Sequence, residues 1–360
     1  MKDVIIVGGG LKGMLTALFL HDAGLKVMVL DQNELGRESS WAGGGLVSPL
    51  YPWRSSDAVS VLAQYSQQHY PALCERMRDE VGIDPQWLRS GLLVTDTSEH
   101  AHAQRWAQTW GYELKQLSGS DLQACEPQLA STIPQALFLP ALGQVRSPRL
   151  SAALRASLHQ RPVLVSEHYP VTGLHVEKGQ VAGVYLGSEL FKAGKVVLAA
   201  GAWMGSFPQV QSAGIQVYSM LAESIMFRSH PGLLKRIVVH QNHYLIPRQD
   251  GRIVCGSVLD GGGLEKQITA EARTQLWELS CGLVPALQGL PVHNHWGSLL
   301  SFSMDNVPYI GEHPEIRGLY VNAGHGNHGI ATGLASAQLL VDQIVGRTSF
   351  TDGKAYRLGR

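Results

Sequence analysis

The first 31 residues combine a glycine loop with two apolar runs, and this combination constrains the fold more than any other feature of the sequence. Residues 4–7 form a continuous β-branched run, as in a strand buried on both faces of a parallel sheet. Apolar residues recur at helical spacing over 12–23 until Gly24, and residues 26–30 form a second apolar run that ends on Asp31. This order predicts the strand–helix–strand unit that opens a Rossmann-like parallel sheet.

The glycines after the first strand occupy the positions that a dinucleotide-binding loop requires. Gly8 allows the tight turn, Gly10 lets the backbone approach a pyrophosphate, and Gly13 lets the helix pack closely on the strand. The helix N-terminus then presents free N–H groups to the phosphates, and the acid that ends the second strand accepts hydrogen bonds from the ribose hydroxyls. We therefore predict dinucleotide contacts from Gly8, Gly10, Leu11, Gly13, Asp31 and Gln32.

A second loop of small residues favours FAD over NAD as the dinucleotide. Residues 36–45 follow the ribose acid closely and consist largely of serine, alanine and glycine. A flavin ring that lies along a backbone needs small residues, because larger side chains would block its approach. A flexible surface loop is the alternative, but Trp41 and the apolar residues that follow argue against simple flexibility. The predicted flavin contacts in this loop are Ser39, Ser40, Ala42, Gly43, Gly44, Gly45 and Leu46.

The composition excludes several classes of partner. Lys and Arg together number 29, as do Asp and Glu, so no net field attracts nucleic acid or an anionic membrane. The four cysteines lie far apart, with no CxxC pair and no histidine at metal-ligand spacing, and no metal site is predicted. No stretch approaches the roughly 18 apolar residues of a membrane span, and no signal peptide is recognised. We expect a cytoplasmic protein with a small-molecule partner, and association into a homo-oligomer is left open.

The remaining pattern predicts an α/β protein, α+β overall, with two interleaved domains. A buried strand at 195–198 and another near 320 each run into a glycine turn, as late strands of the same parallel sheet would. The alternating strands at 215–258 suit an antiparallel sheet with one covered face. We assign the FAD-binding domain to residues 1–80, 140–212 and 303–350, and the antiparallel-sheet substrate domain to residues 81–139 and 213–302.

Several segments together resemble the D-amino-acid-oxidase family of FAD-dependent oxidoreductases. They include the opening strand and glycines, the loop at 36–45, residues 48–54, 200–203, 244–248 and 305–311, and Ala323-Gly324-His325. The similarity covers nearly the whole chain and is strongest to the bacterial glycine oxidases of thiamine biosynthesis.

The resemblance implies a non-covalent FAD and removal of a hydride from a carbon next to an amine. It places the loop at 39–46 along the flavin, Val171 at the adenine side, and the turn at 325–330 at the pyrimidine end of the ring. The reduced flavin would pass its electrons to oxygen or to another acceptor. Further cofactor contacts implied by the matching segments are Ala200, Gly201, Trp203, Gly324, Gly326, Asn327, His328, Gly329 and Ile330.

The chain departs from the family where the substrate carboxylate is bound. Members that oxidise amino acids hold the carboxylate with an arginine in a Trp-x-Gly-x-Arg segment and often with a second arginine in the Gly-His turn, but here Leu300 and Asn327 stand at these positions. Loss of a buried arginine–carboxylate pair costs roughly 2–5 kcal/mol. The family tyrosine is kept as Tyr244. Either another cation binds the carboxylate or the substrate has none; the candidate cations are Arg54, His243, His325 and His328.

Three functions are compatible with these residues. The first is oxidation of glycine or a related small amine, with Tyr244 orienting the substrate. The second is oxidation of an amine that is larger or lacks a carboxylate, and the third is a non-catalytic FAD-binding partner protein. For the enzymatic functions, the predicted substrate-site residues are Tyr244, Arg54, His325, Asn327 and Leu300.

The glycine loop yields the first prediction. FAD is expected to copurify with the protein, and Gly10→Val is expected to abolish this, because a branched side chain would occupy the pyrophosphate approach. The flavin absorbance per protein measures the outcome. A variant that keeps the full yellow chromophore would show that the phosphates lie elsewhere.

Overall fold

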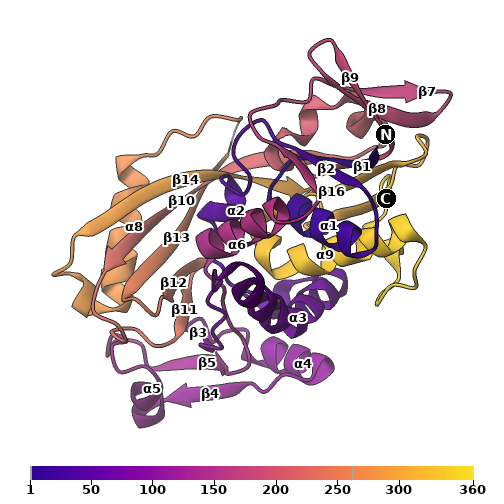
Figure 1. Ribbon diagram of the computed structural model, residues 1–360. Coiled ribbons are helices and arrows are strands. Elements are labelled where there is room, and N and C mark those ends of the chain that lie inside the picture. Colours follow the sequence, from indigo (N-terminus) through magenta and orange to yellow (C-terminus); the bar gives the residue numbers. More distant parts are fainter. Residues whose placement is uncertain (1, 262) are drawn as a thin grey trace.

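The computed structural model describes residues 2–261 and 263–360, and the chain in it is built around two sheets that lie side by side (Figure 1). Met1 and Gly262 fall within the predicted FAD-binding and substrate domains and lie outside the described residues. The polypeptide passes between the two sheets several times, so segments that are distant in sequence become neighbours. The cavities described below lie between these layers.

The first sheet is parallel at its centre. Strand β1 pairs in parallel with β2 on one side and β9 on the other, β6 extends β2, and β16 extends β9. Only the edge strand β15 runs antiparallel in this row, and a β7–β8 hairpin continues from β9. Its strands are β1 (Lys2–Val7), β2 (Val27–Leu30), β6 (Leu164–Ser166), β7 (Gly173–Glu177), β8 (Gln180–Leu186), β9 (Glu189–Leu198), β15 (Tyr309–Glu312) and β16 (Leu319–Ala323).

Both faces of this sheet are covered, which explains the uninterrupted apolar run at the start of the chain. Val4 and Ile6 pack into a core formed with α1, α3, α6 and α9, while Ile5 and Val7 pack on the opposite face with β8, η2 and α7. A strand buried on both faces needs no polar alternation. The helices are α1 (Leu11–Asp22), α3 (Asp57–Val81), α6 (Ser147–His159), α7 (Pro208–Ser212), α9 (Gly329–Val345) and the short η2 (Gly201–Ser206).

The second sheet is antiparallel apart from one pair. Its order is β14-β10-β13-β12-β11-β3-β5-β4, and only β11 and β3 run in parallel. Helices α5 and α8 cover one face and α4 covers part of the other. Its strands are β3 (Leu92–Val94), β4 (Lys115–Ser118), β5 (Gln135–Leu139), β10 (Val217–Arg228), β11 (Ile237–His240), β12 (His243–Pro247), β13 (Arg252–Gly261) and β14 (Val292–Ser303). The remaining helices of the described residues are α2 (Ser39–Ala42), α4 (His100–Trp110), α5 (Gly119–Cys125), α8 (Ala270–Leu283) and the short η1 (Pro52–Arg54), η3 (Pro285–Leu287), η4 (Gly326–His328) and η5 (Gly353–Tyr356).

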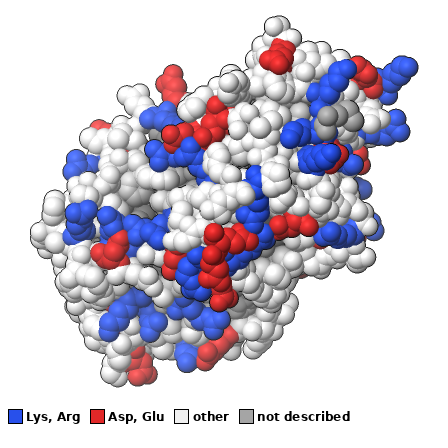
Figure 2. Space-filling view, in the orientation of Figure 1, with Lys and Arg blue, Asp and Glu red and all other residues white. Residues whose placement is uncertain are grey.

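The surface agrees with the balanced composition. Figure 2 shows basic and acidic side chains intermixed over the visible face, with no large area of one sign. Among the described residues, no helix is both long and apolar enough to cross a membrane. The predicted fold class is confirmed: a Rossmann-like parallel sheet is combined with a largely antiparallel one.

The contact between α1 and the glycine loop yields a stability prediction. A Cβ atom on Gly13 would lie 1.9 Å from the carbonyl oxygen of Gly8, so Gly13→Ala is expected to destabilise the protein by roughly 1–3 kcal/mol. Gly282, in α8, is the matched control, because a Cβ atom there meets nothing within 4 Å and alanine favours a helix by up to about 1 kcal/mol. Chemical denaturation of both variants measures the difference. Equal stability of the two would contradict the close packing.

Candidate active site

Two adjoining pockets lie at the carboxyl ends of the parallel strands. The outer pocket runs along the glycine loop and the end of β2, and the inner pocket lies between this region and the second sheet. The two pockets share Lys12, Ser39, Ser40 and Gly201, so they adjoin along these residues.

Most residues singled out from the sequence line one of the two pockets. Ser39, Ser40 and Gly201 line both, whereas Gly13, Arg54 and His328 line neither. The outer pocket is lined by Gly8, Gly10, Asp31, Gln32, Val171, Ala200 and Trp203, and the inner pocket by Leu11, Ala42, Gly43, Gly44, Gly45, Leu46, Tyr244, Leu300, Gly324, His325, Gly326, Asn327, Gly329 and Ile330.

The outer pocket has the features of a pyrophosphate and ribose site. The Asp31 carboxylate accepts hydrogen bonds from the backbone N–H of Gly9 (2.6 Å) and of Asn33 (2.8 Å), which fixes the loop, and burial raises its pKa. The N–H of Leu11 donates to the Ser40 hydroxyl (2.7 Å). The helix N-terminus at Gly10 has no side-chain cap, and a Cβ atom there would meet only Ser40. A helix N-terminus whose own cap residue supplies no side-chain acceptor, and which has space in front of it, suits an anion.

The small-residue loop is held in place from the second sheet. The buried Arg248 guanidinium donates to the carbonyl oxygens of Gly44 (2.6 Å) and Val145 (3.2 Å), and Trp296 Nε1 donates to that of Ala42 (3.1 Å). A Cβ atom on Gly44 would lie 2.8 Å from the Tyr244 ring. The loop therefore has no room for side chains here, as a surface for a flat ring requires.

The histidines in the C-terminal turn are uncharged. His325 contacts the Thr332 hydroxyl through Nδ1 (2.8 Å) and the Asn322 side-chain oxygen through Nε2 (2.7 Å). Burial, with a smaller effect from Lys12, holds the pKa of His325 well below its usual value, and burial alone lowers the pKa of His328 to about 4. Neither side chain can act as a cation at neutral pH.

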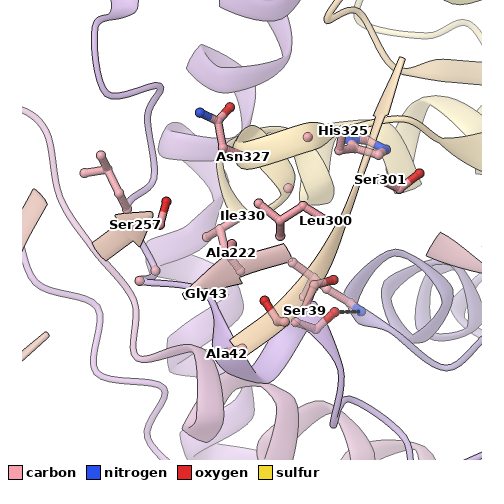
Figure 3. A pocket seen from close by; sticks show the side chains of 18 of the residues that line it. Ser39, Ala42, Gly43, Ala222, Ser257, Leu300, Ser301, His325, Asn327 and Ile330 are labelled. Atoms are coloured by element: carbon pink, nitrogen blue, oxygen red, sulfur yellow. Dashed lines mark hydrogen bonds between the residues drawn. The ribbon is translucent and has the colours of Figure 1, made fainter. Parts of the chain in front are cut away.

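The other two candidate cations, Arg54 and His243, lie away from the inner pocket. The Arg54 guanidinium bonds to Glu99 (2.8 Å), and His243 lines neither pocket and has a pKa lowered by burial. Leu300 lines the pocket wall, whereas Asn327 is exposed and points away from the labelled cluster (Figure 3). Among the described residues that line the inner pocket, Lys12 alone carries a formal charge, and burial lowers its pKa to about 8.

The structure also adds residues that the sequence had not indicated. Lys12 sits inside the glycine fingerprint, where a charged residue on an otherwise apolar helix was the available signal. The other polar lining side chains are mostly hydroxyls, and several come from strands of the second sheet whose inward face the sequence left undefined. These residues are Ser224, Ser257, Ser298 and Ser301.

The outer pocket has the features of a nucleotide site on a parallel sheet, and it adjoins a second cavity lined by a loop of small residues. This arrangement is typical of a dinucleotide-dependent redox enzyme. Comparison with known families is more specific. The model of the DAO family, described as "FAD dependent oxidoreductase", matches residues 3–343. The chain therefore belongs to this family. The family, the fold class and the FAD cofactor predicted from the sequence are thereby confirmed.

Full-length relatives include several glycine oxidases. The glycine oxidase of Pseudomonas putida is 40% identical over 99% of this chain and 98% of its own, and that of Pseudomonas aeruginosa is 38% identical with the same coverage. The crystal structure of glycine oxidase from Geobacillus kaustophilus superposes with a TM-score of 0.93 at 27% identity, covering 100% of this chain and 98% of that one.

The anchoring of the small-residue loop is testable. Arg248→Met removes the donor to two buried carbonyl oxygens and is expected to cost about 1–3 kcal/mol of stability and to weaken FAD retention. Arg252→Met is the control, because its guanidinium forms only a partly exposed ion pair with Asp250. Denaturation and flavin content measure both effects. If both variants behaved alike, Arg248 would not anchor the loop.

Proposed function

We propose that the protein oxidises the carbon next to an amine in a small molecule, as an enzyme of the glycine-oxidase type. The observation that carries the proposal is the inner pocket, where the small-residue loop, the C-terminal turn and the second sheet meet around one space. FAD supplies the two-electron acceptor when bound. The names of the full-length relatives support an amino acid or amine as the substrate.

The predicted site residues divide between two roles in this proposal. The residues of the outer pocket hold the adenosine and pyrophosphate, and those of the inner pocket enclose the flavin ring and the substrate. The same division supports the predicted domains, with the first sheet in the FAD-binding domain and the second sheet in the substrate domain. His328 and Gly13 line neither pocket. In this proposal His328 shapes the C-terminal turn, and Gly13 allows the close contact between α1 and the glycine loop.

The side chains of the pocket position the amine and exclude water. Tyr244 Oη lies 3.5 Å from Ser224 Oγ, and together they offer neutral hydrogen-bonding groups to the polar end of a substrate. Leu300 and Ile330 contribute apolar side chains to the wall of the inner pocket. A neutral amine that loses a hydride needs orientation more than a base, so the lack of a lining carboxylate among the described residues is no obstacle.

A second candidate differs in the substrate. Leu300 occupies the position of the carboxylate-binding arginine and the histidines of the turn are neutral, so the inner pocket favours an amine that lacks a carboxylate or carries it far from the reacting carbon. A buried carboxylate beside Leu300 would face leucine and serine hydroxyls and would have no guanidinium next to it.

Anaerobic mixing with a panel of amines separates these functions. Bleaching of the flavin spectrum by glycine or sarcosine supports the first, and bleaching only by amines without a carboxylate supports the second. No bleaching by any member would contradict an enzymatic role and favour a non-catalytic FAD protein. Reoxidation in the presence of oxygen or a quinone then identifies the acceptor.

Leu300→Arg tests whether this position sets the substrate. If the second candidate is right, the substitution is expected to lower the KM for glycine at least tenfold, an effect of about 1.4 kcal/mol that lies below the roughly 2–5 kcal/mol typical of such pairs. Leu300→Met is the control, since it conserves volume without adding charge. Steady-state kinetics gives the comparison. Efficient glycine turnover by the unmodified enzyme would contradict the second candidate.

A further inference from the structure

Lys12 lies where the two pockets meet and is the one residue of the glycine fingerprint with a charged side chain. It is the second residue of α1, but its side chain reaches across to the start of α9. Its Nζ is 3.2 Å from where a Cβ atom of Gly329 would be, and its Cδ is 3.4 Å from the equivalent point at Gly333. The ammonium group therefore sits beside the first turn of α9, on the wall of the inner pocket.

This ammonium has no direct ion-pair partner among the described residues. Within residues 2–261 and 263–360, Lys12 makes no side-chain hydrogen bond and no ion pair, and no acidic residue lines the inner pocket. The neighbouring His325 and His328 are held neutral by burial. A largely buried cation without a partner is costly, so a ligand that brings negative charge to this point would be favoured.

The direction of the dinucleotide identifies which part of it reaches Lys12. Asp31 lies at the ribose end of the outer pocket and the N-terminus of α1 lies in front of the space for the pyrophosphate. The flavin ring must continue beyond this point, past Lys12, into the inner pocket. The N-terminus of α9, a 17-residue helix, adds its own partial positive charge at the same corner.

We propose that the Lys12 ammonium faces the pyrimidine edge of the bound flavin and stabilises the negative charge that this edge gains on reduction. A hydride from the substrate carbon carries two electrons and one proton to N5 of the ring, and the resulting charge spreads over N1 and the C2 carbonyl oxygen. The substrate leaves as the imine after its nitrogen releases a proton to solvent. Charge placed near N1 is a known means by which a protein tunes a flavin, and Lys12 and the α9 N-terminus provide it here.

This inference rests on FAD binding and not on the identity of the amine, so its test uses no amine. Sulfite is the probe, because it adds to N5 of the oxidised ring and leaves the same negative charge at N1. We expect Lys12→Met holoenzyme to bind sulfite roughly tenfold more weakly and to have a midpoint potential lower by about 30 mV, the value for a tenfold change in a two-electron couple. The dissociation constant of oxidised FAD should change less than about threefold, because the oxidised ring is neutral.

Three further variants keep the test decisive. Lys12→Arg should restore sulfite affinity to near the wild-type value, since the charge returns. Lys12→Gln provides a second neutral variant if the methionine protein folds poorly. Lys26→Met, which removes an exposed lysine from the far end of the α1–β2 segment, should change neither sulfite affinity nor potential.

Two outcomes would overturn the proposal. A loss of FAD affinity of tenfold or more with an unchanged potential would place Lys12 at the pyrophosphate. An unchanged sulfite affinity would also overturn it, and if acetate shifted the flavin spectrum of the wild type but not that of Lys12→Met, Lys12 would be assigned to a substrate carboxylate. Either result leaves the proposed amine oxidation standing, so the two proposals fail separately.

Discussion

The close packing of α1 on the glycine loop is the contact on which the site depends. The Gly8 carbonyl oxygen sits where a side chain on Gly13 would begin, so the helix axis comes as near to β1 as a backbone allows. This approach aims the helix N-terminus into the space between the two pockets, and the Ser40 hydroxyl then ties the second loop to Leu11. The phosphate position, the small-residue loop and the reach of Lys12 toward α9 all follow from this one approach.

Local sequence signals predicted the fold well because they coincide with burial. The run at 4–7, the glycines and Asp31 each carry a local requirement that a single sequence displays, and helix α3 likewise begins after its Ser56 cap and ends at a left-handed Gly82. The parallel pairing of β11 with β3 could not be read in this way, because it joins residues more than 140 positions apart. Only the fold brings such a pair together.

The substrate pocket was predictable only in part, for the same reason. The absence of arginine at position 300 is visible in the sequence, but the fates of the candidate cations are not. Arg54 is held by Glu99, which lies 45 residues away, and His325 is neutralised by burial against Asn322 and Thr332. The position of the Lys12 ammonium group could not be predicted from the sequence, because the side chain packs against α9, which lies near the other end of the given sequence. Side-chain charge is readable from a sequence, whereas its partner usually is not.

The interleaving of the two sheets also determines when the protein can become functional during its synthesis. Strand β9 is covered on its outer side by β16, and α1 packs against α9, so the nucleotide layer is incomplete until residues 319–345 have left the ribosome. The glycine loop emerges first and must wait for partners some 300 residues away. Long-range pairing of this kind slows folding and exposes apolar strands in the meantime. The cofactor can therefore be captured only after β16 and α9 have emerged, and a nascent chain that stalls before β16 would leave β9 with an open edge.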